Sequence, residues 1–91
     1  MDDLFMSVAI EEARIAFSED EVPVGACLVK ENRVVLRDHN RTRQSANPLA
    51  HAEKLILDSI TQQGVKYLYN YTLYVTRSEE HTSELQSRQV I

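Results

Sequence analysis

The spacing of apolar residues near the start of the chain predicts a helix from Leu4 to Phe17. Apolar positions in this stretch recur at steps of three and four, which is the spacing of one buried helical face. The residues of this face are Phe5, Val8, Ala9, Ala13, Ala16 and Phe17. Acidic residues occupy positions 19–21, and we expect the helix to end there.

Two apolar runs after this helix predict a β-hairpin. Residues 22–29 read VPVGACLV, a nearly unbroken apolar run that is typical of a strand covered on both faces. Glu31 and Asn32 are expected to form a turn, after which Arg33 to Leu36 make a second strand, antiparallel to the first. The polar, aperiodic segment from His39 to Ala46 predicts a loop.

A second helix and a third strand complete the pattern. Asn47 followed by Pro48 is a good helix start, with asparagine as the cap and proline where no amide donor is required. Gly64 favours a left-handed stop, and the aromatic and β-branched run Tyr71 to Thr76 predicts a strand. The expected buried face of the second helix is Ala52, Leu55, Ile56 and Ile60.

The order helix, strand, strand, helix, strand predicts an α/β fold, a sandwich in which helices cover a small sheet. We expect Val24 to Val29 to be its most buried segment. The 91 residues suit one small domain. The single cysteine, Cys27, lies in the first apolar strand, where we expect it to be buried and inert rather than a metal ligand.

The candidate chemistry centres on His51 and Glu53, in the motif HAE, which the expected start at Pro48 places in the second turn of a helix. Alone, such a histidine is more often a packed or capping residue, and such a glutamate a helix former. The context changes this interpretation. A strand containing PVGA, a His39–Asn40 pair, a proline shortly before HAE and YTLYVT about twenty residues later occur in one order.

These motifs, across residues 1–76, resemble the cytidine and deoxycytidylate deaminase superfamily, and within it most closely the bacterial tRNA adenosine deaminases. The resemblance implies a cytidine deaminase-like α/β/α sandwich and a hydrolase that removes an amino group from a nucleobase. It implies that His51 is the histidine ligand of zinc, that Glu53 is the catalytic proton shuttle, and that Asn40 contacts the target base or its sugar. It also implies tRNA as a partner and a homodimer when intact.

The chain departs from this family after Thr76. The family continues into P-C-x-x-C, whose thiolates complete the zinc site, whereas here the sequence reads RSEEHTSELQSR. We therefore expect residues 1–76 to be the front part of a deaminase domain, cut off after the third strand. Residues 77–91 are expected to be a non-native tail, since 77–88 match an in-frame translation of a common sequencing adapter. The alternative is a solvated tail or a weak charged helix.

Two consequences follow from that departure. With His51 as the one trusted ligand, and His81 inside the suspect tail, the chain is expected to bind zinc weakly and to be inactive. The third strand would also lack a neighbour along its outer edge. The alternatives are a deaminase of free cytosine, guanine or a nucleotide, and, in another class, a non-catalytic RNA-binding module in which HAE is only structural.

Charge and composition bear on whether nucleic acid or a membrane is a partner. A net charge of −4 argues weakly against bulk attachment to nucleic acid or to an anionic membrane. For the arginines between positions 33 and 43 we prefer a solvated face to a phosphate-contact patch, and for the four tyrosines a core-and-edge role to a base-stacking platform. No apolar run reaches the roughly 20 residues of a membrane span, and the start at Asp2 and Asp3 lacks a basic secretory signal, so we expect a cytoplasmic protein.

Overall fold

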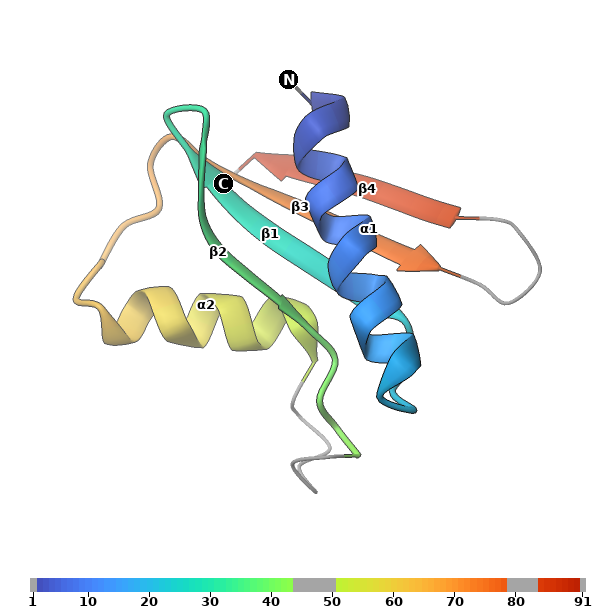
Figure 1. Cartoon of the computed structure of the whole chain (residues 1–91). Helices are drawn as coiled ribbons and strands as arrows, with labels where there is room; N and C mark the ends of the chain where they lie inside the picture. Colours follow the sequence, from blue (N-terminus) through green and yellow to red (C-terminus); the bar gives the residue numbers. More distant parts are fainter. Residues whose placement is uncertain (1, 44–50, 79–83, 91) are drawn as a thin grey trace.

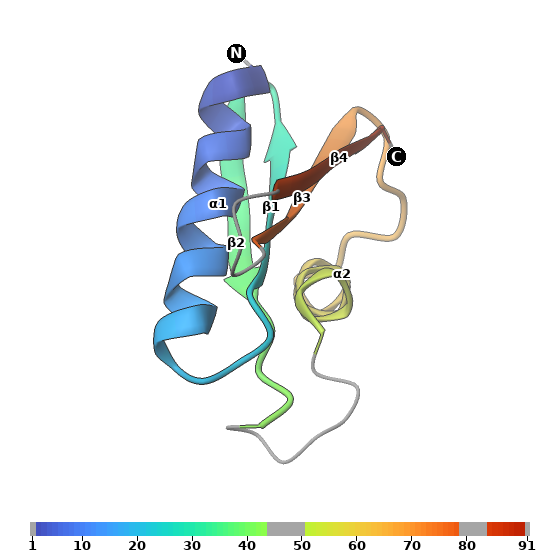
Figure 2. The same ribbon diagram turned by 90° about the vertical axis from the view of Figure 1, so that its right-hand side faces the viewer.

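The computed structural model describes residues 2–43, 51–78 and 84–90. Its sheet has the strand order β2-β1-β3-β4, and every neighbouring pair is antiparallel. The two helices cover opposite faces of this sheet (Figures 1 and 2). The predicted α/β sandwich is therefore confirmed. The elements are α1 (Asp2–Ser18), β1 (Val24–Lys30), β2 (Arg33–His39), α2 (Ala52–Gln62), β3 (Tyr71–Ser78) and β4 (Glu84–Val90).

Helix α1 ends at the predicted acidic segment, where Asp20 takes a left-handed φ of 61°. Four residues of the predicted face are buried and Val8 is half-buried, but Phe17 is 58% exposed. Its place is taken by Glu12, which is buried. At 100° per residue Phe17 lies about 80° around the helix from Ala9 and Glu12 about 60° on the other side, so the buried arc includes Glu12.

The predicted hairpin is confirmed. Glu31 and Asn32 have φ of 53° and 59°, which is the conformation of a two-residue type I′ turn. Strand β2 continues beyond Leu36 to His39, so the expected loop begins later than predicted. Residues 25–29 of β1 are all buried, in agreement with the expected burial of this segment, while Val24 at its start is half-buried.

Gly25 lets α1 pack directly on the backbone of β1. A Cβ atom at this position would run into the carbonyl oxygen of Ala9 and the amide nitrogen of Ala13. Both obstacles are backbone atoms of a helix, so neither can move aside as a flexible side chain would. The close approach brings the buried side chain of Glu12 against the end of the sheet.

Alternation along β1 divides the core into two clusters. Ala26 and Leu28 face α2, where they pack with Ile56 and other apolar residues from α2 and β3. Cys27 and Val29 face α1 and join its Phe5 and Ala9, with Tyr74 of β3. Successive side chains of a strand point to opposite faces, so the side chains of Ala26 and Cys27 lie on opposite sides of the sheet.

Helix α2 begins at Ala52, and His51 is its N-cap, with an extended backbone at φ −83° and ψ 148°. His51 thus stands at the start of the helix, as expected, but ahead of its first turn and not within its second. The proposed start at Asn47 and Pro48 lies outside the described residues. Gly64 has φ 90°, which confirms the left-handed stop. On the predicted face, Ala52, Ile56 and Ile60 are buried and Leu55 is half-buried.

The segment after Thr76 differs from expectation. Strand β3 continues to Ser78, and β4 pairs with it from Thr72↔Val90 to Ser78↔Glu84. The alternative of a charged helix is therefore wrong for residues 84–90, and so is the expectation that β3 lacks a neighbour. An open strand edge presents unpaired N–H and C=O groups, and backbone pairing with them requires no apolar pattern in the added strand. Among the described helices, none combines the length and apolarity needed to cross a membrane.

Candidate functional site

A cavity of about 360 Å³ lies where the N-terminus of α2 meets the sheet. All three residues proposed from the sequence, Asn40, His51 and Glu53, contribute to its wall. They come from the end of β2, the cap of α2 and the first turn of α2. The rest of the wall is formed by Val22, Val24, Ala52, Val75 and Arg77. The structure therefore brings the proposed site residues together in one cavity that apolar residues also line.

Asn40 fixes the position of α2 relative to the sheet. Its side chain is 4% exposed, and its Oδ1 accepts a hydrogen bond of 2.9 Å from the amide of Ala52. Its backbone N–H donates to the carbonyl oxygen of Val24 over 3.1 Å. An asparagine oxygen that accepts an otherwise unsatisfied helical amide acts as an N-terminal cap, although here it comes from a distant strand. The first turn of α2 is thereby held at the cavity.

His51 and Glu53 are both exposed and reach the cavity from different backbone conformations. Two residues separated by two positions within a helix do not share a face. His51, however, precedes the helix with an extended backbone, and its carbonyl oxygen accepts from the amide of Leu55 at 2.9 Å. The rule therefore does not apply to this pair, because only Glu53 lies within the helix, and both side chains can reach the same cavity. Glu53 lies in the first turn, where the helix dipole favours a negative charge.

A buried network that the sequence did not reveal lies on the α1 side of the sheet. The ring nitrogens of His39 are 2.8 Å from Glu12 Oε1 and 2.7 Å from Glu19 Oε1. Arg37 donates from Nε to Glu12 Oε2 over 2.7 Å, and pairs with Glu11 at 2.9 Å. His39 is buried, so these contacts fix the residue immediately before Asn40. A signal was present in the sequence, because Glu12 falls on the apolar arc of α1.

Asp38 extends this network. Its Oδ1 accepts from the amide of His39 and from Nε of Arg41, both at 2.8 Å. Ligand atoms of Glu12, Asp38 and His39 lie within 4.8 Å of one another, which is a spacing that a metal ion can use. Each of them is already engaged, however, since both carboxylates accept from arginine and both ring nitrogens contact carboxylates. We therefore interpret the cluster as structural.

The arginines between positions 33 and 43 are largely used within the fold. Hydrogen bonds that Arg37 and Arg41 donate to Glu12 and Asp38 respectively raise the pKa of these arginines. Arg43 donates from its guanidinium to the carbonyl oxygen of Asp20. These contacts agree with the preference for a solvated, internally paired face over a phosphate patch. Paired guanidinium groups are poor candidates for phosphate contacts because an existing carboxylate must first be displaced.

Cys27 is completely buried, and its thiol donates to the carbonyl oxygen of Phe5 over 3.3 Å. Burial raises the pKa of this thiol to about 11, which keeps it protonated. It also faces α1, across the sheet from Ala52 and the cavity. The expected buried, inert role is confirmed, and the sequence contains no other cysteine.

The cavity's donor set is therefore incomplete for a catalytic zinc. Such sites use three protein ligands and an open position. Among the described residues that line the cavity, His51 supplies an imidazole and Glu53 a carboxylate, and no thiol is present. His81 lies outside the described residues. The residues of this chain by themselves do not fit a catalytic zinc ion.

The four tyrosines separate into two kinds. Tyr71 and Tyr74 belong to β3 and are buried, in agreement with the core-and-edge role. Tyr67 and Tyr69 precede the strand and are 69% and 72% exposed, so that role is wrong for them. The sequence suggested alternation along a single strand, but β3 begins only at Tyr71.

Comparisons with known proteins agree with this arrangement. Residues 1–79 match the family model described as the cytidine and deoxycytidylate deaminase zinc-binding region. The tRNA-specific adenosine deaminase of Aquifex aeolicus is 44% identical over 73 residues, which are 79% of this chain and 48% of that protein. The chain thus spans about half the length of the curated relatives it matches.

Solved structures show the same likeness. A chain from a study of A-to-I editing by tRNA:A34 deaminases at the wobble position of transfer RNA has a TM-score of 0.75 and 42% identity. The match covers 82% of this chain and 58% of that one. Guanine deaminase from Bacillus subtilis has a TM-score of 0.69 and 26% identity, over 80% of this chain and 48% of that chain.

Proposed function

Because the chain belongs to the cytidine and deoxycytidylate deaminase family, we propose that the protein containing this domain converts adenosine to inosine in tRNA. The observation that carries the proposal is the convergence of Asn40, His51 and Glu53 on one cavity at the N-terminus of α2. The names of the relatives support the substrate class, since tRNA adenosine deaminases and a tRNA:A34 deaminase study are among the matches. The proposal includes a cytoplasmic location, which suits a tRNA substrate, and the homodimer that the family resemblance implies for the intact domain.

The roles follow the family resemblance, residue by residue. His51 is the histidine ligand of zinc, and the exposed N-cap position leaves its ring open to the cavity. Glu53 is the group that moves protons, a function for which an exposed carboxylate beside the same cavity is suited. Asn40 holds Ala52 with its oxygen, and its amide group carries two N–H donors with which it can contact the base or sugar.

We further propose that residues 1–76 are the native deaminase part of this chain and that 77–91 are foreign to it. In support, the family motif P-C-x-x-C is absent and Cys27 lies across the sheet. The chain as it stands should hold zinc weakly and release no ammonia from adenosine. Replacing residues from Arg77 onward with the natural downstream sequence should restore zinc binding together with activity.

The test compares these two proteins. Metal analysis after dialysis and inosine formation on a tRNA anticodon stem-loop are measured for the 91-residue chain and for the protein with the natural downstream sequence. The proposal predicts zinc and inosine for the second protein only. One tightly held zinc per chain in the 91-residue protein, or equal activity of the two, would show that the ligand argument is mistaken.

A second candidate activity is deamination of a free base. The likeness to guanine deaminase favours it, since the two folds agree with a TM-score of 0.69. Guanine, cytosine and their nucleotides should therefore be assayed beside the stem-loop with the repaired protein. A free base turned over while the stem-loop remains unchanged would select this alternative, and binding of RNA without any ammonia release would select the non-catalytic module.

A further inference from the structure

Tyr67 and Tyr69 form an exposed aromatic pair that no part of the proposed reaction uses. Their ring centroids are 5.8 Å apart and their planes differ by 21°, so the rings stack on each other. They are nevertheless 69% and 72% exposed, which leaves most of their surface open to solvent. Two large stacked rings held outside the core are an unusual use of apolar surface, since tyrosine in a fold is normally at least half-covered.

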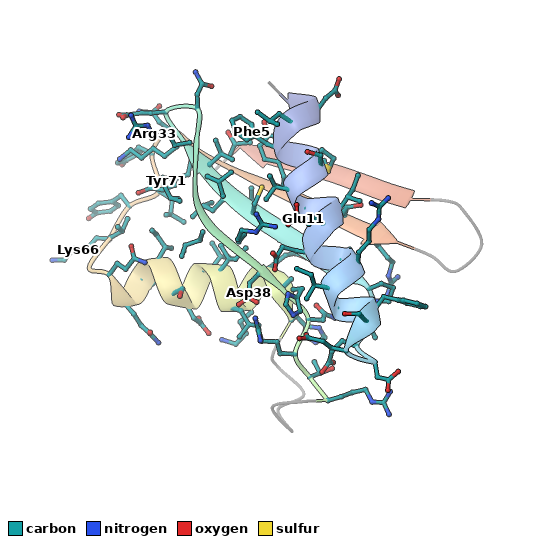
Figure 3. The ribbon with its side chains drawn as sticks, in the orientation of Figure 1. Phe5, Glu11, Arg33, Asp38, Lys66 and Tyr71 are labelled. Carbon is teal, nitrogen blue, oxygen red and sulfur yellow. The ribbon has the colours of Figure 1, made fainter. Side chains whose placement is uncertain are left out.

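Cationic side chains lie next to this segment in the chain and on two strands in register with Tyr71. Lys66 precedes Tyr67 in the chain and is exposed. Across the sheet, Arg33 of β2, Lys30 of β1 and Tyr71 of β3 form one row of paired positions, so Arg33 lies about 10 Å from Tyr71 at the usual strand spacing. Figure 3 shows Arg33, Tyr71 and Lys66 at the same end of the molecule.

The local charge opposes that of the whole chain. Residues 30–33 and 64–71 carry three cationic side chains and one anionic side chain, Glu31, whereas the full chain has a net charge of −4. Lys30 also places its Nζ 5.0 Å from the centre of the Tyr71 ring, which shows that cations and aromatic rings already associate here. This end of the molecule is therefore locally attractive to a polyanion that has flat aromatic groups.

Single-stranded nucleic acid is a polyanion that carries flat aromatic groups. Its bases stack on aromatic side chains whatever their sequence, and its phosphates contact lysine and arginine. We propose that Tyr67 and Tyr69, with Lys66, Lys30 and Arg33, form a second contact surface for a single-stranded segment of RNA, away from the catalytic cavity. The choice of RNA as the polyanion rests on the proposed function.

The location suits an auxiliary contact and not a catalytic one. The cavity lies at the N-terminus of α2 and Lys66 follows its C-terminus. Eleven helical residues separate these two ends by about 16 Å. One RNA hairpin is wide enough to reach both places, so that a loop base could enter the cavity while an unpaired nucleotide stacks on the tyrosines.

Binding of a fluorescein-labelled oligouridylate of about eight nucleotides to the full chain tests the surface directly. The combined variant Tyr67→Ala with Tyr69→Ala should bind about 5- to 150-fold more weakly, the range expected for loss of base stacking. The pair Tyr67→Phe with Tyr69→Phe keeps the rings and should bind like the parent. Lys66→Ala should lower the salt dependence of log K by about 0.7, the share of one phosphate contact.

Phe17→Ala is the matched control, since Phe17 is a 58% exposed aromatic residue on α1, outside the proposed surface. Its affinity for RNA should equal that of the parent. Sedimentation of each variant distinguishes RNA binding from self-association. The proposal is overturned if the parent does not bind, if the alanine pair binds as the parent does, or if that pair only dissociates an oligomer.

These outcomes are separate from those of the deaminase proposal, because the binding measurement needs neither zinc nor turnover. A domain that binds RNA through the tyrosines but never forms inosine contradicts only the deaminase function. A repaired domain that forms inosine equally well with and without the two tyrosine rings, and binds equally well, contradicts only the second contact surface.

Discussion

The two faces of the sheet use polar side chains in opposite ways. On the α1 face, Glu12, Arg37 and His39 are tied to one another within 2.8 Å, and the first and last of them are buried. On the α2 face, His51 and Glu53 stand exposed at a cavity above an apolar cluster. One face holds charged groups inside the fold, while the other presents the proposed site residues at its surface.

The difference separates a buried charged network from the proposed site. Asn40 is the link between the faces, because His39 before it is held by carboxylates near α1 while its own oxygen holds Ala52 of α2. The network of Glu12, Arg37 and His39 thus lies on the face opposite the cavity, while apolar core clusters lie on both faces. Changes in this network should alter stability, and changes of the exposed His51 and Glu53 should alter activity with little effect on stability.

The largest effect is expected for Glu53→Ala in the protein with the natural downstream sequence. Activity should fall by about 10²- to 10⁴-fold, which is the usual contribution of a positioned proton-transfer group. Zinc content and the unfolding midpoint should be unchanged, because Glu53 is exposed and is proposed not to bind metal. The control His51→Ala should lose both zinc and inosine formation. A Glu53→Ala protein that deaminates at the full rate would mean that another residue moves the proton.

The next effect concerns the stability of the α1 face. Glu12→Ala leaves His39 and Arg37 without their buried carboxylate and should lower the free energy of unfolding by about 3 kcal/mol. The matched control is Glu11→Ala, which removes a carboxylate of 65% exposure from the same arginine and should cost about 0.5 kcal/mol. Urea unfolding of the two variants measures the contrast. Equal losses would show that burial of Glu12 has no energetic importance.

The reactivity of the Cys27 thiol measures how completely α1 covers its face of the sheet. Burial raises its pKa from 9.0 to about 11, so at pH 8 its thiolate fraction should be about 100-fold lower than that of an unfolded thiol, and a disulfide reagent should react at least that much more slowly. Because the folded state favours the protonated thiol, stability should be fully retained below pH 9 and decrease as pH rises to about 11. Native and urea-unfolded chains are compared with the same reagent; equal rates would exclude the buried thiol.

The smallest effect lies on the outer surface of α2. Lys54 and Asp58 form an exposed pair at 2.9 Å, four residues apart, with side chains 50% and 53% exposed. Lys54→Ala should reduce the free energy of unfolding by about 0.3–0.5 kcal/mol, and the difference should shrink in high salt. Thermal unfolding at two salt concentrations measures it. A loss comparable to that of Glu12→Ala would remove the contrast between paired groups inside and outside the fold.

Local patterns predicted the fold because its turns and stops are local. Glu31 and Asn32 are adjacent, and Gly64 lies two residues after the end of α2 at Gln62. The His39 network was not predicted, since Glu12 lies 27 positions earlier and only the packing of α1 on the sheet joins them. The burial of Phe17 was wrongly predicted for a related reason. An apolar residue at the edge of the buried face of a helix is covered only if another element of the fold reaches it.

Three residues of the cavity wall were singled out from the sequence, but their arrangement was not. The motif HAE identified His51 and Glu53, whereas the capping bond between Asn40 and Ala52 depends on tertiary structure. Pairing of β4 was missed because the outer strand adds through its backbone, and its sequence carries no apolar alternation. The exposure of Tyr67 and Tyr69 also escaped the pattern, since aromatic residues before a strand resemble those within it.

The contact between α1 and β1 at Gly25 limits which sequences this domain can explore. A side chain there meets helical backbone, so no compensating substitution in a neighbouring side chain can make room for it. In a saturation library screened for folded protein, position 25 should accept glycine alone. Gly64, which has open space where its Cβ would be, should instead accept asparagine, the residue that best tolerates its positive φ.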